Sequence, residues 1–429
     1  MVMMMWAVSA CAQAPYRITL PDGDALITEE GIYIIEPGMC ERILTIEPGN
    51  VYLAGNSGSY RILDGRGKIL SPVVVSMARY TGGAIIFRHD GFYGVMDMTG
   101  EILIEPIWTQ IAANGDGGYL ALNDSPFDNV ADEIIYIDGD GIQTPSGSHT
   151  VGILPDIRHD RMPYMTTDGR YGFVDGKGNT LTEPVWLYAG GFENGAAIVA
   201  DEAGLGLIDA QMNSVLPCGY VFLERNEYLT AALSADGILE VYSSDGKKQL
   251  FAMEANGCAV TISGGCVALT DQDSARLFSR DGRCIYTGSP KASFSEGLNR
   301  QIIVSDGEWG DKCVWIMDPD GSAVSEPCQQ ILPLAGNRYA FYTMRGATYF
   351  SEVLGGLQKS WDYDSIRYGM LDGAGREILP ADCLEILAVE DDRFILVKND
   401  GVHLSDAGGN IIKSWLLPEE DLSSSGGYE

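Results

Sequence analysis

Two loops of the chain carry the aspartates and glycines that calcium sites use. The stretch DGDGIQTPSGSH, residues 138–149, begins like an EF-hand loop, and DPDGSAVSEPCQ, residues 318–329, begins in the same way. An EF-hand loop needs oxygen ligands at alternate positions and a bidentate glutamate at the twelfth. Ile142 occupies the fifth position of the first loop and His149 the twelfth, and the second loop departs at the same two positions. Both stretches are therefore predicted to form β-turns.

Closely spaced glycines are also typical of phosphate-binding loops, which use backbone N–H groups at the start of a helix. Gly176 and Gly178 lack the third glycine of the G-x-G-x-x-G pattern, because Leu181 stands there, and no helix is predicted to follow. The sequence contains no P-loop and no G-x-S-x-G elbow. No cofactor is predicted.

Histidines, cysteines and acidic residues form no pattern that identifies a reaction. The histidines are residues 89, 149, 159 and 403, and none of the nine cysteines forms a CxxC pair. Sixty acidic residues are too many for one acid–base pair to stand out. We predict no metal site and no catalytic residue. Most cysteines are predicted to be small buried apolar residues, and disulfides are left open for an exported chain.

The aspartates make better sense as part of a repeated turn. Eleven short apolar runs each end in Asp, Ser or Thr; a glycine follows three residues later in ten of them, and a proline follows seven to nine residues later in eight. These marker residues are Thr28, Asp64, Asp97, Asp138, Asp175, Asp209, Ser243, Ser279, Asp318, Asp372 and Ser405. Steps of 33 to 54 residues between them indicate a tandem repeat.

Each marker is predicted to begin a three-residue hairpin loop. A type I turn favours Asp, Asn or Ser at its first corner, because that side chain accepts backbone N–H groups ahead of it. Glycine then takes the left-handed position without a Cβ clash, and in FVDGKGNT these two residues are Asp175 and Gly178. The proline is expected to end the pairing of the return strand, because it cannot donate a ladder hydrogen bond.

Further strand-like runs follow the proline in many units, so each unit is predicted to hold three or four short strands. A repeat of about 40 residues with four strands has the size of one propeller blade. The predicted fold class is all-β, a tandem β-repeat that forms one or two β-propellers from about eleven blades. Two propellers of five or six units are preferred, because one propeller usually has about 4–8 blades. A single large closed ring and an open β-solenoid are the alternatives.

The units resemble WG repeats, also called KWG repeats, in which an aromatic–Gly strand precedes an Asp-x-x-Gly turn and an Ile-x-Pro segment. Tyr93-Gly94, Tyr171-Gly172 and Tyr368-Gly369 match the aromatic–Gly pair, and FSEGL at 294–298 matches the F-x-E-G segment. The likeness covers nearly the whole chain. It implies a bacterial, propeller-like repeat protein that serves as a binding or interaction module.

The predicted organisation follows from these units. Residues 1–14 are a partial signal or lipoprotein-like segment, residues 15–220 and 221–415 are two sets of WG-repeat blades, and residues 416–429 are a disordered tail.

The longest step between markers predicts an insertion at 343–364. Insertions in repeat proteins often carry binding, and aromatic residues dominate recognition surfaces. Trp361 in this insertion is therefore the candidate contact for a ligand or partner. Trp108 and Trp186, which follow their markers at the same distance, are predicted to pack between units.

The first residues resemble a bacterial lipoprotein signal. Val8-Ser9-Ala10-Cys11 follows an apolar run and matches a lipobox, whose cysteine becomes the lipidated first residue. The match lacks a basic start, and only ten residues precede Cys11. Cys11 is the predicted lipidation site; cleavage after Ala14 and a hydrophobic first strand are the alternatives. The chain is predicted to be exported, to the cell envelope or beyond it.

The net charge of the chain limits the classes of partner that it can bind. With 60 acidic and 28 basic residues the net charge is −32, which repels a phosphate backbone, so no nucleic-acid partner is predicted. No run of 18 apolar residues predicts a membrane span. The predicted function is a non-catalytic scaffold of the bacterial cell envelope that binds an unidentified protein or a cell-surface glycan. The alternative is an extracellular hydrolase or glycan-active enzyme on the same scaffold.

Overall fold

The computed structural model describes residues 15–20, 23–28, 33–47, 50–114, 117–123, 131–150, 152–153, 161–307, 312–351, 356–390 and 392–415. Within them the chain forms forty β-strands and one short 3-10 turn, Leu298–Arg300. The strands are short because glycine and aspartate turns interrupt each apolar run.

The strands are described here in chain order. The first fourteen are β1 (Tyr16–Leu20), β2 (Gly23–Ile27), β3 (Tyr33–Ile35), β4 (Arg42–Glu47), β5 (Val51–Asn56), β6 (Ser59–Asp64), β7 (Met77–Thr81), β8 (Ala84–His89), β9 (Phe92–Asp97), β10 (Ile102–Trp108), β11 (Gln110–Ala113), β12 (Tyr119–Leu122), β13 (Asp132–Ile137) and β14 (Gln143–Thr150). The next are β15 (Gly152–Ile153), β16 (Arg161–Met165), β17 (Tyr171–Asp175), β18 (Thr180–Trp186), β19 (Tyr188–Ala189), β20 (Ala196–Asp201), β21 (Gly204–Asp209), β22 (Ser214–Arg225), β23 (Leu229–Ser234), β24 (Ile238–Ser243) and β25 (Gln249–Glu254). The last are β26 (Ala259–Ser263), β27 (Cys266–Thr270), β28 (Ala275–Phe278), β29 (Cys284–Gly288), β30 (Ser293–Glu296), β31 (Ile302–Asp306), β32 (Cys313–Met317), β33 (Gln330–Leu334), β34 (Arg338–Ser351), β35 (Gly356–Asp372), β36 (Glu377–Cys383), β37 (Glu385–Glu390), β38 (Arg393–Lys398), β39 (Gly401–Asp406) and β40 (Ile411–Trp415).

Each sheet is an antiparallel meander whose strands neighbour one another in chain order, and the described strands form ten sheets. Nine of these sheets have three or four strands and correspond to one repeat each. The seven-stranded sheet β19–β25 holds two repeats, because β22 is the last strand of one and the first strand of the next. The structure therefore contains eleven repeats, and the predicted all-β, propeller-like fold is confirmed.

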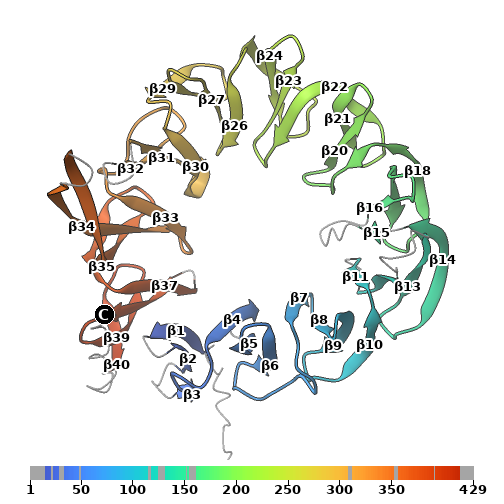
Figure 1. The fold of residues 1–429 in the computed structure, drawn as a ribbon, viewed down its shortest axis with the longest axis horizontal. Helices are drawn as coiled ribbons and strands as arrows, with labels where there is room; N and C mark the ends of the chain where they lie inside the picture. The colour runs from blue at the N-terminus through green and yellow to red at the C-terminus, as the bar shows by residue number, and fades with distance from the viewer. Residues whose placement is uncertain are drawn as a thin grey trace, which may run out of the picture.

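The eleven units follow one another around a single ring, and the last unit returns to the side of the first (Figure 1). This corrects the preference for two propellers. The boundary expected near residue 220 lies inside β22, which pairs with β21 along one edge and with β23 along the other. Leu207, Leu223 and Ala232 pack in one cluster across this junction, so the apolar faces offer no place for the ring to divide.

Clusters of buried apolar side chains hold neighbouring units together. The described residues form eleven such clusters, one for each contact between neighbours in a ring of eleven. Because successive residues of a strand point to opposite faces, one strand serves two clusters. In β38, Phe394 packs with the preceding unit, whereas Ile395 packs against Ile27 of the first unit. Apolar packing therefore closes the ring.

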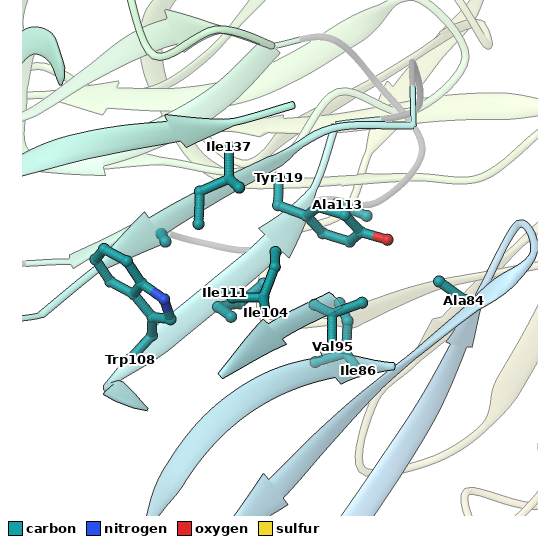
Figure 2. Close-up of a cluster of buried hydrophobic side chains, with 10 residues drawn as sticks. Ala84, Ile86, Val95, Ile104, Trp108, Ile111, Ala113, Tyr119 and Ile137 are labelled. Atoms are coloured by element: carbon teal, nitrogen blue, oxygen red, sulfur yellow. The ribbon is translucent and has the colours of Figure 1, made fainter. Parts of the chain in front are cut away.

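Figure 2 shows one of these clusters, between the sheet of β7–β10 and the sheet of β11–β14. Ile86 and Val95 of the first sheet lie beside Ile111 and Tyr119 of the second. Trp108 is 6 % exposed in the same cluster. Its burial confirms the prediction that this tryptophan packs between units.

The predicted turn chemistry is confirmed at Asp175. Its Oδ1 accepts the backbone N–H groups of Lys177 at 2.8 Å and Asn179 at 2.9 Å, and Gly178 has a φ of +82°. A Cβ on Gly178 would lie 2.9 Å from the side chain of Ser146, so the turn also packs closely on the preceding unit. The same pair of hydrogen bonds occurs at Asp64, Asp97, Asp138, Asp209, Asp372 and Asp406.

Two of the described turns depart from the sequence pattern, and the turn predicted after Thr28 lies outside the described residues. In the unit without the glycine, Met212 itself takes the left-handed position with a φ of +64°. In the last unit the turn begins at Asp406 and uses Gly409, one residue later than the predicted Ser405. Ser405 is instead fully buried in β39, because an apolar strand face extends past it.

Pro106 and Pro184 do not end their outer strands, which corrects the expectation for these two prolines. Pro106 and Pro184 lie inside β10 and β18, where the pairing register shifts, and pairing resumes at Trp108 and Trp186. These strands are at sheet edges, where a residue without an N–H is tolerated. The proline in each of these two edge strands also disfavours pairing with a strand of another sheet.

Acid is expected to destabilise the ring through its turns. Hydrogen bonds, of which the one from the Asn410 side chain has the largest effect, hold the pKa of Asp406 below its usual 3.8. Hydrogen bonds also lower the pKa values of Asp97 and Asp209. A carboxyl with a lowered folded-state pKa stabilises the fold above its unfolded pKa, and this contribution is lost as the pH falls through the folded value. The urea concentration at the unfolding midpoint should therefore decrease when the pH is lowered below about 4.

A triple variant tests this assignment. Asparagine keeps the acceptor oxygen but cannot titrate in this range. With Asp97, Asp209 and Asp406 replaced by asparagine, the urea midpoint should change less between pH 5 and pH 2 than it does in the unmodified chain. An identical pH dependence in the two proteins would contradict a role for these carboxyls.

Candidate functional site

One hairpin is longer than the other hairpins that the structure describes. β34 has 14 residues and β35 has 17, whereas no other described strand exceeds 12. The two strands stay paired from Arg338 with Asp372 to Ser351 with Gly356. The segment 343–364, expected as an insertion, is thus an extension of two strands of the repeat. It projects beyond the neighbouring sheets on the outside of the ring (Figure 1).

A bulge bends this hairpin where it leaves the ring. The register shifts between Thr343 and Arg345, and extra residues of β35 stand opposite this step. Ser365 closes the bulge, because its Oγ accepts the N–H of Arg345 at 2.8 Å and donates to the carbonyl oxygen of Asp362 at 2.5 Å. Tyr363 lies in the bulge and is 58 % exposed. A bulge re-aims the side chains of its strand, which here turns an aromatic ring toward solvent.

Gln329, the residue directly before β33, fixes the base of the hairpin. Its Nε2 donates to the carbonyl oxygen of Met344 at 3.0 Å, and its Oε1 accepts the N–H of Met344. A side-chain amide that donates and accepts in this way takes the place of a backbone partner beyond the start of β33. The direction of the hairpin is therefore set on the side of β33 as well as on the side of β35.

A pocket with a volume of 660 Å³ lies beside this base, between the unit of β30–β32 and the sheet of β33–β36. Phe341 and Leu371 are buried and contribute an apolar wall. Lys312, Glu326 and Glu377 also line the pocket and supply charges of both signs. An apolar hollow with a few charged groups is typical of sites that accept a side chain or a small ligand.

Two thiols, those of Cys313 and Cys328, line this pocket, and the Cys328 thiol is not suited to catalysis. Burial raises the pKa of Cys328 to about 12, so the thiol is protonated at neutral pH. Its Sγ donates to the carbonyl oxygens of Gln330 at 3.2 Å and Val314 at 3.5 Å. Because the thiolate is the nucleophilic form of cysteine, Cys328 contributes packing and not a reacting group. No disulfide joins the cysteines in the part of the chain that the structure describes.

The residues singled out from the sequence have different places. Trp361 lies on β35 opposite Gly346, in the extended part of the hairpin. Cys11 lies outside the described residues, as do the segments 1–14 and 416–429. Trp186 packs edge to face against Phe173 with ring centroids 5.6 Å apart, which confirms its predicted place between units.

Sequence reasoning missed Tyr363 and Gln329. Tyr363 is one of 21 tyrosines, and an alternating strand pattern does not show which face a bulge turns outward. The long step between markers located the segment but not the contact residue within it. Gln329 has no local signal, because its partner, Met344, lies 15 residues further along the chain.

The described residues contain no group of three or more His, Cys, Asp or Glu side chains able to hold a metal ion. The EF-hand-like stretch at 138–149 forms a turn in which Asp138 accepts backbone N–H groups. Among the same described residues no helix is long and apolar enough to cross a membrane.

Comparison with known proteins identifies the repeat. The model of the WG containing repeat matches residues 93–122 and 171–201, so the resemblance noted in the sequence is confirmed at two places. No curated protein matches the chain.

Several solved structures are similar to this chain at low sequence identity and low TM-score. BamB from Moraxella catarrhalis is 14 % identical over 71 % of this chain and 91 % of its own, with a TM-score of 0.30. A eukaryotic initiation factor is 10 % identical over 78 % of this chain and 85 % of its own, with a TM-score of 0.39. PorZ of Porphyromonas gingivalis is 13 % identical over 80 % of this chain and 52 % of its own, with a TM-score of 0.27.

Proposed function

We propose that this chain, a ring of repeats that includes WG-containing repeats, is a non-catalytic scaffold that binds a partner protein through the hairpin β34–β35 and the pocket at its base. The observation that carries the proposal is the asymmetry of the ring. Among the described units, this one extends two strands beyond the common plan and exposes an aromatic side chain, Tyr363, where the extension begins. Aromatic residues next to apolar hollows are typical anchors of protein interfaces.

The hairpin is built to hold a fixed direction, which favours recognition over a flexible tether. Gln329 and Ser365 fix the backbone on both sides of the bulge through four hydrogen bonds. A contact surface that is ordered before binding loses less conformational entropy when the partner docks. The Cys328 thiol of the pocket is protonated at neutral pH, so this side chain supports packing and not nucleophilic attack.

We also propose that the scaffold acts at the bacterial cell envelope, anchored by lipid on Cys11. The support is the sequence Val8-Ser9-Ala10-Cys11 after an apolar run. Intact mass spectrometry of the membrane fraction is expected to show a mature chain that begins at lipidated Cys11. An unmodified Cys11 in that fraction would contradict the anchor without touching the proposed role of the hairpin.

A photo-crosslinking amino acid at position 363 tests the binding proposal. Crosslinking in living cells is expected to join the chain to one protein of the envelope. The matched control places the same amino acid at Ile412, which is 53 % exposed on the outer strand β40. An adduct from position 412 but not from 363, or no protein adduct from 363, would contradict the proposal.

Once the partner is identified, Tyr363→Ser should weaken binding by about tenfold or more, because a buried aromatic hot spot contributes on the order of 2 kcal/mol. The measurement is a titration with the purified partner, with Tyr80→Ser as a control on another unit. Turnover of a screened glycan or peptide that disappears on substitution of a single Asp or Glu would favour the enzyme alternative instead.

A further inference from the structure

A second pocket, with a volume of 600 Å³, lies on another part of the ring, where three consecutive units meet. It collects side chains from the unit that ends with β25, from the turn between β28 and β29, from the turn before β31 and from the turn after β32. The charged and aromatic residues of its lining are Lys248, Arg280, Arg283, Arg300, Asp281, Asp320 and Tyr228. We call this the basic pocket. It is separate from the hairpin-base pocket, with which it shares no lining residue.

The basic pocket stands out against the charge of the chain. The whole chain has 28 Lys and Arg residues against 60 Asp and Glu residues, whereas the segment 247–300 has seven basic and five acidic residues. A local excess of positive charge in a strongly acidic protein attracts anions to that place and repels them elsewhere.

The four cations of the basic pocket lack the ion pairs that other cations of the chain make. Lys248, Arg280, Arg283 and Arg300 form no salt bridge with any described residue. Nearby Arg276, by contrast, pairs with Asp271 at 3.2 Å. Arg170 pairs with Glu202 at 2.7 Å in another part of the ring. Lys248, Arg280 and Arg300 thus keep their positive charges available, whereas Arg283 interacts electrostatically with Asp281 and Asp320.

The two carboxylates in the pocket are committed to their own turns. Asp281 accepts the hydroxyl of Ser279, and Asp320 accepts the N–H and hydroxyl of Ser322 at 2.8 Å and 2.6 Å. These hydrogen bonds hold the pKa of both carboxyls below the usual 3.8, so both are ionised at neutral pH. Four cations and two carboxylates leave a formal charge of about +2 on the lining.

Local backbone geometry places Arg300 over an aromatic ring. Asn299 and Arg300 have φ values of +53° and +68°, a region that side chains other than glycine rarely adopt. The guanidinium carbon of Arg300 lies 5.2 Å from the centre of the Tyr228 ring. Arg283 is oriented from the other side, because its Nη2 donates to the carbonyl oxygen of Asp320 at 3.2 Å. Two of the guanidiniums are therefore positioned before any ligand arrives.

We propose that the basic pocket binds a phosphate group, either as free phosphate or as part of a phosphate-bearing polymer. A phosphate monoester carries a charge close to −2 at neutral pH, which balances the positive charge of the lining. A ligand with a single carboxylate would balance only half of that positive charge. Guanidinium forks bond phosphate oxygens in pairs, and three of the four cations are arginines. The open form of the pocket across three units suits a phosphate that is attached to a larger molecule.

Isothermal titration calorimetry of the purified chain tests this proposal with two probes, inorganic phosphate and tripolyphosphate, at low ionic strength. The double variant Arg280→Gln/Arg283→Gln is expected to lose tenfold or more in affinity. The control Arg66→Gln/Lys68→Gln makes the same change of charge on an exposed turn of another unit and should bind normally. Circular dichroism of both variants checks that they fold.

The two probes distinguish the sources of phosphate. Binding of inorganic phosphate alone supports a free-phosphate ligand, and binding of tripolyphosphate alone supports a polymer. Affinity should rise between pH 5.5 and pH 7.5, because the second phosphate pKa is about 6. Failure of both probes to bind, equal losses in the two double variants, or tighter binding of polygalacturonate than of either phosphate would overturn the proposal.

Discussion

Replacement of Phe173 by alanine is expected to lower the free energy of unfolding by about 3–5 kcal/mol. Phe173 is fully buried between two units, with ring centroids 5.2 Å from Phe192 and 5.6 Å from Trp186. Removing the ring eliminates apolar burial and leaves a cavity that edge-to-face neighbours cannot fill without moving. Urea denaturation followed by tryptophan fluorescence measures the effect.

The matched control for this substitution is Phe92→Ala. Phe92 is 42 % exposed, so its removal opens no cavity, and the expected change is below about 1 kcal/mol. Equal losses from the two substitutions would contradict the view that packing between units, and not strand content, sets the stability of the ring.

The repeat was predictable from the sequence because its turn is a local structure. Asp175 and Gly178 are three residues apart, and their hydrogen bonds and backbone angles depend on neither partner units nor ring size. The same locality explains the error of one residue in the last unit, where Ser405 and Asp406 both suit the first corner of a turn.

Closure of the ring was not predictable, because it depends on residues at opposite ends of the chain. Ile27 and Leu404 read as ordinary apolar strand residues, and the number of units in a ring depends on the small angle between neighbouring sheets, which composition does not reveal. The expectation of two propellers followed from the usual blade count. The chain instead has an apolar face at each of its eleven contacts.

The candidate sites could be predicted only in part from the sequence. Spacing located the long hairpin, since it adds residues between two markers, but Tyr363 is exposed by a bulge that leaves no trace in an alternating pattern. The basic pocket was missed because the net charge of the chain hides a local excess, which a count over single repeats would reveal.

The charged substitution Leu404→Asp is expected to open the ring. Leu404 is fully buried in the cluster that joins the last unit to the first, where Ala25 and Ile27 face it. An unpaired carboxylate in this cluster loses its hydration and gains no partner, and the contact can avoid that cost by separating. In repeat proteins each unit contacts mainly its neighbours, so the other contacts should persist.

Small-angle X-ray scattering should therefore show a larger radius of gyration for Leu404→Asp, and limited proteolysis should begin in the terminal units. Ile27→Asp, on the other side of the same contact, should produce the same change. Ile412→Asp in the last sheet keeps its carboxylate in solvent and should leave the scattering unchanged, since Ile412 is 53 % exposed. An unaltered radius of gyration in both buried-site variants would show that the contact between the first and last units does not depend on this cluster. Global unfolding of both variants would show that closure of the ring stabilises every unit and not the terminal units alone.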